Sequence, residues 1–238
     1  MLAHERDHWW YRARREILQR VIERRVGRVG RLLEIGCGTG SNLQMLRGFG
    51  NVEGIETSAF AREYAASRGF SVRDGRLPDG LPQSIGTFDA VCMFDVLEHI
   101  EGDLDALITV RRLLKPGGRI VVSVPAYQWL FSDHDIRLHH YRRYTRGRLH
   151  ELLRRAGFVV SWSSHFNSLL FLPAAVVRFA SRMASRKARA FAPAAPSHAL
   201  PVGNGLLYRL FASERWLTDM VPLPFGLSIV AVATPAAS

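Results

Sequence analysis

Short apolar runs alternate with longer amphipathic segments along most of this chain, and the alternation predicts its architecture. The apolar run at residues 32–35 leads into a glycine-rich stretch and then into a helical pattern, which predicts a buried strand that turns tightly into a helix. Strand-like runs that alternate with helical ones predict an α/β fold, in which a parallel sheet is covered by helices on both faces. With 238 residues, 47% of them hydrophobic, the chain suits a single domain, residues 1–238, with a full core.

The glycine-rich stretch after the first strand, E-I-G-C-G-T-G at residues 34–40, is the most informative motif. Gly36, Gly38 and Gly40 allow positive φ angles and a close approach of a ligand to the backbone, and the following helix offers free N–H groups at its start. The dinucleotide-binding fingerprint requires a glycine at the sixth position, which is Ser41 here, and this disfavours a nicotinamide oxidoreductase. The spacing E-x-G-x-G-x-G instead resembles motif I of the class I S-adenosylmethionine-dependent methyltransferases.

Further stretches resemble the same family in the same order along the chain. They correspond to the family's second, third and fourth strands, the helix stop before the fifth strand, and the fifth, sixth and seventh strands: residues 51–56, 71–75, 88–95, 113–118, 119–124, 157–163 and 226–233. The resemblance therefore implies a Rossmann-like, seven-stranded, mostly parallel sheet with an antiparallel last strand. Helices on both faces and a helical insertion before the last strand complete the expected fold. Within this family, the chain resembles the enzymes that act on small molecules (methyltransferase 11/23-like), and it is similar to the quinone-biosynthesis methyltransferases.

The resemblance also implies S-adenosylmethionine as the cofactor, with S-adenosylhomocysteine as the product. In relatives an acid after the second strand, here Glu56, holds the ribose hydroxyls, and an acid after the third strand, here Asp74, accepts a hydrogen bond from the adenine amino group. We expect residues 8–18 to form a helix across the cofactor mouth, from which Arg14 pairs with the cofactor's carboxylate or else lies on a solvated basic face. The complete expected set of cofactor-binding residues is Arg14, Glu34, Gly36, Cys37, Gly38, Glu56, Thr57, Asp74, Gly75, Phe94, Asp95 and Val96.

Four segments make up the expected domain. Residues 1–29 contain the helix over the cofactor mouth, residues 30–163 the cofactor-binding core, residues 164–225 an insertion, and residues 226–238 the last strand and tail. An insertion of this length inside a compact domain is usually functional or disordered. We interpret it as a helical cap that helps to select the acceptor, with padding of the sheet edge as the alternative, and we expect a second helix in it at residues 206–220.

The first helix expected in the insertion, at residues 172–189, carries an arginine stripe. Arg178, Arg182, Arg186 and Arg189 recur at helical spacing, while apolar side chains fall on another face. Such a helix suits an anionic membrane surface, and a solvated basic face explains the same pattern.

The net charge of +11 likewise predicts an anionic partner, such as a phospholipid surface, a phosphorylated substrate or nucleic acid. Almost all of the excess is arginine, which a GC-rich genome also produces, so nucleic acid stays the weaker alternative. The start of the chain is charged, and no apolar run reaches the roughly 18 residues of a membrane span. Cys37 and Cys92 both fall in expected core strands, which favours buried, reduced thiols. We therefore expect a cytoplasmic protein, with peripheral binding to the inner membrane face through residues 172–189.

Residues 125–144 follow the fifth strand and are dense in aromatic, acidic and imidazole side chains, at the carboxyl end of a strand where open α/β folds bind ligands. Methyl transfer needs alignment of the acceptor and exclusion of water, and it needs a general base only where the acceptor carries a proton, as a hydroxyl does. Aromatic faces could in addition hold the sulfonium. We assign catalysis in the first instance to His134, His139 and Tyr141. The full set of candidates is His134 with Asp133 and Asp135 to orient it, then His139 and His140, for the base, and Tyr127, Trp129, Tyr141 and Tyr144 for the sulfonium.

The sequence D-x-x-E-H, formed by Asp95, Glu98 and His99, provides an alternative on the same face. We expect Asp95 at the end of a strand, with Glu98 and His99 in the first turn of the next helix. It resembles the E-x-x-E-H metal site of certain RNA 2′-O-methyltransferases and of quinone-biosynthesis O-methyltransferases, where a divalent cation lowers the pKa of the acceptor hydroxyl. This chain has Asp where those enzymes have Glu, and D-V-L-E-H strings also occur in metal-free relatives, so the leading interpretation includes no metal. The candidates to complete such a site are His134, His139 and His140.

The absence of several known motifs narrows the range of possible methyl acceptors. The sequence after residue 93 is F-D-V-L rather than the N/D-P-P-Y/F motif of base-amine methylation, and two lysines are too few for the Lys-Asp-Lys-Glu tetrad of ribosomal 2′-O enzymes. Cytosine C5 methylation needs a nucleophilic cysteine, and both cysteines are assigned to the core. The D-V-L-E-H string resembles small-molecule enzymes, which with the apolar insertion favours a small or lipid-linked acceptor methylated at oxygen. The alternatives are an RNA 2′-O-methyltransferase and a non-catalytic protein that binds S-adenosylmethionine.

Overall fold

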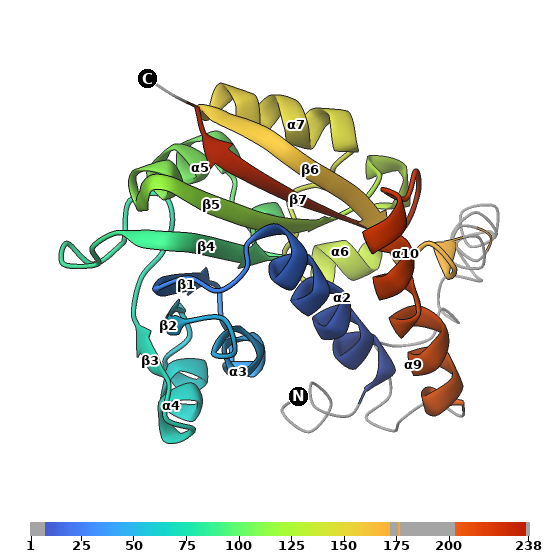
Figure 1. Cartoon of the computed structure of the whole chain (residues 1–238), viewed down its shortest axis with the longest axis horizontal. Helices are drawn as coiled ribbons and strands as arrows, with labels where there is room; N and C mark the ends of the chain where they lie inside the picture. Colours follow the sequence, from blue (N-terminus) through green and yellow to red (C-terminus); the bar gives the residue numbers. More distant parts are fainter. Residues whose placement is uncertain (1–7, 172–175, 177–202, 237–238) are drawn as a thin grey trace.

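A seven-stranded sheet forms the centre of the computed structural model, which describes residues 8–171, 176 and 203–236. The strands are β1 (Arg31–Ile35), β2 (Asn51–Ile55), β3 (Ser71–Arg73), β4 (Phe88–Phe94), β5 (Leu114–Pro125), β6 (Phe158–Phe166) and β7 (Ser228–Pro235). Their order is β3-β2-β1-β4-β5-β7-β6 (Figure 1). The strands β1 to β5 pair in parallel, whereas β7 is antiparallel to both β5 and β6. The predicted mostly parallel sheet with an antiparallel last strand is therefore confirmed.

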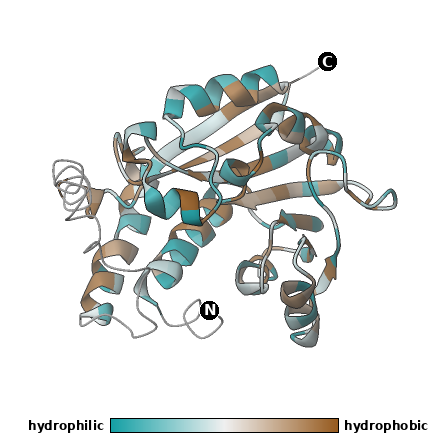
Figure 2. Ribbon diagram, turned by 180° about the vertical axis from the view of Figure 1, so that it is seen from behind, coloured by the Kyte–Doolittle hydropathy of each residue, from teal (hydrophilic) through white to brown (hydrophobic). Residues whose placement is uncertain are grey.

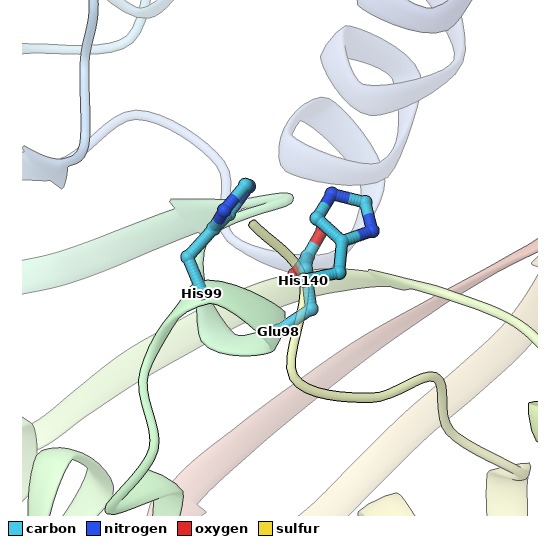
Figure 3. A group of neighbouring side chains, drawn as sticks. All are labelled: Glu98, His99 and His140. Carbon is cyan, nitrogen blue, oxygen red and sulfur yellow. The ribbon is translucent and has the colours of Figure 1, made fainter. Parts of the chain in front are cut away.

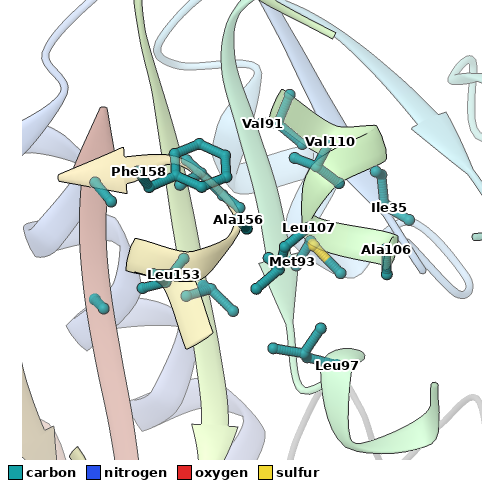
Figure 4. Close-up of a cluster of buried hydrophobic side chains, with 14 of the residues drawn as sticks. Ile35, Val91, Met93, Leu97, Ala106, Leu107, Val110, Leu153, Ala156 and Phe158 are labelled. Atoms are coloured by element: carbon teal, nitrogen blue, oxygen red, sulfur yellow. The ribbon is translucent and has the colours of Figure 1, made fainter. Parts of the chain in front are cut away.

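Helices cover both faces of this sheet, as expected. The α-helices are α2 (Trp9–Arg25), α3 (Ser41–Leu46), α4 (Ala59–Ser67), α5 (Asp103–Arg112), α6 (Asp133–Arg137), α7 (Arg146–Arg155), α9 (Asn204–Ala212) and α10 (Glu214–Met220), with the 3₁₀ helices η1 (Leu97–His99) and η2 (Gln128–Leu130). Alternate side chains of a strand point to opposite faces, so β4 sends Val91 and Met93 to one core and Cys92 to the other. The first core lies under α5 and α7 (Figure 4). The second lies under α2, α3 and α9.

The sequence of α2 explains both its ends and its buried face. The His8 ring nitrogen accepts a hydrogen bond from the Trp10 backbone N–H at the start, and Arg24 and Arg25 complement the helix dipole in the last turn. Gly27, with a φ of 76°, ends the helix in the left-handed conformation. The buried residues of α2 recur at helical spacing and include one cation: Ala13, Arg14, Ile17, Leu18, Val21 and Ile22.

Four details differ from the sequence expectations. Strand β5 begins at Leu114, so the expected helix stop at residues 113–118 lies mostly inside it, with a shift in register opposite β4. Cys37 lies in the turn after β1 rather than in a strand, although it is buried, as is Cys92 in β4. The expected helix at residues 206–220 is two helices, α9 and α10, which meet at Ser213. The histidine of the D-x-x-E-H string lies in η1, before the longer helix α5 begins.

The helix with an arginine stripe predicted for residues 172–189 lies outside the described residues, because Val176 is the one residue of this segment that the structure describes. Among the residues that the structure describes, no helix is both long and apolar enough to cross a membrane.

Helices α9 and α10, from the far end of the insertion, pack against α2. The Trp9 backbone N–H donates to Asn204 Oδ1 at 2.9 Å, and the carboxylate of Glu16 accepts hydrogen bonds from Tyr208 and Arg215. The fully buried Phe211 ring stacks on Phe166, with ring centroids 6.5 Å apart, and meets Trp9 edge-on. Apolar burial and one polar cluster therefore hold this part of the insertion to the N-terminal helix.

Truncation of Phe211 tests this packing. Phe211→Ala should lower the free energy of unfolding by about 3 kcal/mol, because it leaves a cavity between α9, α2 and β6. Leu210→Ala, on the exposed side of the same helix, should cost less than about 1 kcal/mol. Urea denaturation followed by circular dichroism measures both values. Equal losses for the two variants would contradict the packing described here.

Candidate cofactor and acceptor site

A first cavity of about 420 Å³ opens at the carboxyl ends of β1, β2 and β4. The chain leaves β1 for α3 on one face of the sheet and leaves β4 for α5 on the other, so the cavity lies at the point where open α/β sheets bind ligands. Its lining residues come from the turn after β1, the ends of β2 and β4, and the segment after β3: Ile35, Gly36, Ile55, Glu56, Thr57, Gly75, Arg76, Leu77, Asp95, Val96, His99 and Ile100.

The glycine turn has two positions with different requirements. Gly36 has a φ of 72°, and a Cβ there would lie 2.5 Å from Val96 Cγ2, so packing as well as backbone conformation requires glycine. Gly38 has a φ of 53°, and a Cβ there would meet nothing within 4 Å. The backbone at Gly38 is therefore open to an approaching ligand, as a cofactor-binding turn requires.

The Glu56 carboxylate is fixed beside this turn. Its Oε2 accepts a hydrogen bond from the Gly38 backbone N–H at 2.9 Å, and its Oε1 accepts one from the Ser58 backbone N–H at 2.9 Å. Glu56 and Thr57 both line the first cavity. An acceptor-only group held in this way fits the two hydroxyls of a ribose.

Six of the expected cofactor residues are not among the residues that line the first cavity: Arg14, Glu34, Cys37, Gly38, Asp74 and Phe94. The Asp74 carboxylate is exposed and forms an ion pair with Arg62 at 2.8 Å, while the next three residues, Gly75, Arg76 and Leu77, line the cavity instead. Arg76 and Leu77 were not among the predicted cofactor-binding residues, although both directly follow the predicted third strand. Glu34 is fully buried beneath the glycine turn, where Asn42 Nδ2 donates to its Oε1 at 2.7 Å and its Oε2 has no hydrogen-bond partner. Burial raises the pKa of Glu34 to about 8.

A second cavity, of about 390 Å³, adjoins the first, because Asp95 and His99 line both. It lies between the N-terminal part of α2, the end of β4 and the segment after β5. Aromatic and aliphatic side chains share its walls with imidazoles and charged groups. The lining residues are Trp10, Tyr11, Arg14, Phe94, Asp95, Glu98, His99, Pro125, His134, Leu138, His140, Arg143, Asn167, Leu227 and Ser228.

Arg14 reaches this junction from α2, as the sequence led us to expect, and it is not on a solvated face. Its side chain is 7% exposed, and its Nη2 lies 2.6 Å from Asp95 Oδ2. The guanidinium also lies over the rings of Trp10 and Phe94, at 5.4 and 6.0 Å from the ring centroids. Asp95 has a φ of 55°, unusual for a residue with a side chain, and accepts a further hydrogen bond from Ser123 Oγ.

Glu98, His99 and His140 form a cluster in the wall of the second cavity (Figure 3). One potential ligand atom from each lies within 4.8 Å of the others. Glu98 is 1% exposed, and neither of its carboxylate oxygens has a hydrogen-bond partner. Burial, together with the nearby charge of Asp95, holds the pKa of Glu98 well above its usual range, and burial lowers the pKa of His99. The metal alternative is thus built differently from the sequence expectation, with His140 as the third residue and Asp95 paired to Arg14.

Asp135, which we expected to orient His134, pairs with His140 and Arg143. Asp135, fully buried at the N-terminal capping box of α6, lies with its Oδ1 3.0 Å from His140 Nδ1 and 2.7 Å from Arg143 Nε. Burial alone would raise the pKa of Asp135, but the hydrogen bonds from His140 and Arg143 hold it far below its usual range. His134 still lines the second cavity, whereas the exposed His139 is not among its lining residues. Because α6 ends before His139, the chain turns and brings His140 back to Asp135.

The aromatic residues expected to hold the sulfonium do not line either cavity. Tyr144 is a fully buried core residue whose hydroxyl donates to Asp103 Oδ2 at 3.0 Å. The Tyr127 ring stacks on His165, and Trp129 and Tyr141 are about half exposed. Trp10, Tyr11 and Phe94 supply aromatic groups to the second cavity instead. Trp10 and Tyr11 lie in the segment predicted to cross the cofactor mouth, so their helical position was the available signal.

The sheet order, the open glycine turn and the fixed Glu56 carboxylate define an α/β domain that binds an adenosine-containing cofactor at the end of β1. A family profile described as "Methyltransferase domain" matches residues 3–161. The chain therefore belongs to this family of methyltransferase domains, whose cofactor is S-adenosylmethionine. The predictions of a methyltransferase domain, of its cofactor and of its Rossmann-like fold are confirmed.

Individual relatives agree with this assignment. A probable S-adenosylmethionine-dependent methyltransferase of Mycolicibacterium smegmatis is 30% identical over 159 residues, which cover 65% of this chain and 61% of the relative. A ubiquinone biosynthesis O-methyltransferase of Pseudomonas aeruginosa is 33% identical over 111 residues, which cover 43% of this chain and 47% of the relative. The chain thus spans about half to three fifths of the length of these relatives.

A solved structure shows the same fold. An S-adenosylmethionine-dependent methyltransferase from Clostridium acetobutylicum superposes with a TM-score of 0.58 and 11% identity, covering 95% of this chain and 92% of that one. At this level of identity the likeness concerns the fold alone.

Gly38 provides a test of the cofactor turn. Gly38→Ala should cost about 1–2 kcal/mol of folding stability through its left-handed backbone, and it should weaken S-adenosylhomocysteine binding further, because the new methyl group projects into the open approach to the turn. Gly117→Ala is the matched control, since Gly117 has a φ of 75° and equally open surroundings but lies near the start of β5, at the opposite edge of the parallel sheet from the glycine turn. Isothermal titration calorimetry and thermal melting measure the two effects. If both variants bound S-adenosylhomocysteine as the parent protein does, Gly38 would not adjoin the cofactor.

The buried carboxyl of Glu34 should make stability depend on pH. Its folded-state pKa is about 8 and that of an unfolded glutamate is about 4.3, so between these values only the folded state holds the proton. Ionisation of this group should therefore lower the free energy of unfolding by about 1.4 kcal/mol per pH unit as the pH rises between these two pKa values. Glu34→Gln, which keeps the oxygen that accepts from Asn42, should remove this part of the slope in urea denaturation. Glu63→Gln, on the exposed side of α4, is the matched control. Parallel slopes for Glu34→Gln and the parent protein would contradict a protonated Glu34.

Proposed function

We propose that the protein transfers a methyl group from S-adenosylmethionine to an oxygen atom of a small or lipid-linked acceptor. The cofactor supplies an electrophilic methyl group, and the residues of this chain align the acceptor and exclude water. The observation that carries the proposal is the pairing of His140 with the buried Asp135 in the wall of the second cavity. A positioned imidazole serves an acceptor that must lose a proton, as a hydroxyl does.

Asp135 determines what His140 can do. An ionised carboxylate only accepts hydrogen bonds, so His140 donates from Nδ1, and Nε2 is the nitrogen that can take a proton. The negative charge of Asp135 also stabilises the imidazolium that forms. Arg143, bonded to the same carboxylate oxygen, fixes the orientation of Asp135.

The two cavities suggest how cofactor and acceptor share the site. Glu56 and the Gly38 backbone suit the adenosine part in the first cavity, and Arg14 at the junction suits the carboxylate of the methionine part. The acceptor then occupies the second cavity, beside His140. Trp10, Tyr11 and the aliphatic Leu138 and Leu227 give this cavity apolar walls, which suits an amphiphilic acceptor. The similarity to a ubiquinone biosynthesis O-methyltransferase supports the same class.

A second candidate is metal-assisted methylation at the Glu98, His99 and His140 cluster. The compact arrangement of one carboxylate and two imidazoles favours it, and this ligand set suits zinc or another first-row transition metal. Such an ion would keep Glu98 ionised and would lower the pKa of an acceptor hydroxyl. An RNA 2′-hydroxyl is an acceptor of this kind, so methylation of RNA that a chelator abolishes would support this candidate.

Calorimetric titration with S-adenosylhomocysteine, with NAD as the parallel control, tests the cofactor part of the proposal. We expect S-adenosylhomocysteine alone to bind, with micromolar affinity. Binding of NAD instead would overturn the proposed function. Transfer of labelled methyl groups to phenolic lipids, a lipid extract and RNA then compares the acceptor classes.

Substitution of His140 tests the base. His140→Asn should lower kcat by about 100-fold and leave the affinity for S-adenosylhomocysteine unchanged, because a lost general base affects the proton transfer rather than the cofactor site. His134→Asn is the matched control, because His134 lines the same cavity, and it should lose far less activity if His140 is the base. An unchanged kcat in His140→Asn would exclude it as the base. Loss of activity on addition of a chelator would instead favour the metal-assisted candidate.

A further inference from the structure

Helices α9 and α10 present one continuous row of exposed apolar side chains. Ser213, between the helices, has helical φ and ψ angles of −62° and −23°, so the helical spacing continues across the break. Side chains at intervals of three and four residues therefore share one side. We call this row, together with Val221 directly after α10, the outer face, and its apolar members are 42% to 79% exposed: Leu206, Leu210, Trp216, Leu217, Met220 and Val221. In Figure 2 much of the ribbon of α9, at the edge of the molecule, has the colour of hydrophobic residues.

The opposite side of the same helices is already buried. Phe211 and Ala212 pack into the core, and Glu214 accepts hydrogen bonds from the backbone N–H groups of Ser168 and Leu169. Both sides of this helical pair are thus rich in apolar groups, whereas a surface helix normally turns a polar side to water. An exposed apolar row of this kind marks an interaction site.

Cations surround the outer face. The guanidinium groups of Arg20 and Arg215, which are ion-paired with Glu23 and Glu16, both lie 5.1 Å from the centroid of the exposed Trp216 ring. Arg209 is exposed one turn after Leu206, and α2 alongside contains six arginines against two glutamates. Apolar and tryptophan side chains bordered by arginines are typical of protein surfaces that lie in the interface of an anionic bilayer. A second copy of the chain would instead bring like charges together across such a contact.

The outer face is also joined to the second cavity. The Trp9 backbone N–H donates a hydrogen bond to Asn204 at the start of α9. Trp10, Tyr11 and Arg14, which follow Trp9 in α2, line the cavity. An amphiphilic acceptor held in a bilayer would reach this cavity most directly if α2 and α9 lay against the lipid.

We infer that the outer face of α9 and α10 docks the protein on an anionic phospholipid surface, with its apolar side chains among the lipids and the bordering arginines at the headgroups. The docking is independent of the methyl-transfer chemistry. Only its use, delivery of a lipid-linked acceptor to the second cavity, rests on the proposed function.

Sedimentation of the full chain with vesicles tests the docking without any measurement of methyl transfer. We expect binding to vesicles of mixed phosphatidylglycerol and phosphatidylcholine, and little binding to phosphatidylcholine alone. The double variant Leu210→Glu, Leu217→Glu should bind the mixed vesicles at least about tenfold more weakly, since two apolar side chains would no longer be buried and two negative charges would be added. Both positions are exposed, and circular dichroism and melting temperature check that the fold is retained.

Val159→Glu is the matched control, since Val159 is an exposed apolar residue near the start of β6, outside the outer face. It should bind the mixed vesicles as the parent protein does. Failure of the parent protein to bind, or equal binding by the double variant, would overturn the inference. So would light scattering that shows a dimer which the double variant dissociates, because a second copy of the chain would then cover the outer face. Calorimetry with S-adenosylhomocysteine, which the outer-face variants should leave unchanged, separates a failure of docking from a failure of the proposed function.

Discussion

The ion pair between the buried Arg14 and the partly buried Asp95 is the interaction on which the candidate site depends. It connects the middle of α2 to the end of β4, at the point where the two cavities meet. Two charges removed from water are stable only when their geometry is good and other groups support them. Here Ser123 donates to Asp95, and the rings of Trp10 and Phe94 flank the guanidinium. Without either partner, the charge of the other would remain uncompensated at the junction of the two cavities.

Two acids in the wall beside this pair have pKa values shifted in opposite directions. Burial, to which the charge of Asp95 adds, raises the pKa of Glu98 and favours its neutral form, and neither of its carboxylate oxygens has a hydrogen-bond partner. Asp135 is equally buried but receives hydrogen bonds from His140 and Arg143, and it remains ionised. Burial alone thus does not decide the charge of an acid in this wall. Asp135 is the acid whose negative charge faces an imidazole and can stabilise its protonated form.

Much of the fold could be predicted because its signals are local. The glycine turn has to follow a strand directly, and Glu56 and Arg14 follow from strand ends and helical spacing within single segments. The pairing of Asp135 with His140 could not be predicted from such local signals, because proximity in the sequence favoured His134. The end of α6 and the positive φ of His139 determine that His140 is the residue that returns to the carboxylate. The burial of Tyr144 likewise depends on Asp103, 41 residues earlier in the chain, and no local pattern contains that contact.

Helix α2 also connects the described helices of the insertion to the candidate site. On one side Arg14 closes the junction of the cavities, and on another Glu16 receives hydrogen bonds from Tyr208 and Arg215. The described helices of the insertion are thus fastened to the element that forms the wall of the second cavity. Padding of a sheet edge would require contacts chiefly along β6, whereas a cap requires contact with the cavity wall. The polar contacts of Glu16 and the packing of Phe211 on Trp9 favour the cap, because a shift of α9 would have to move α2, and with it Trp10 and Arg14.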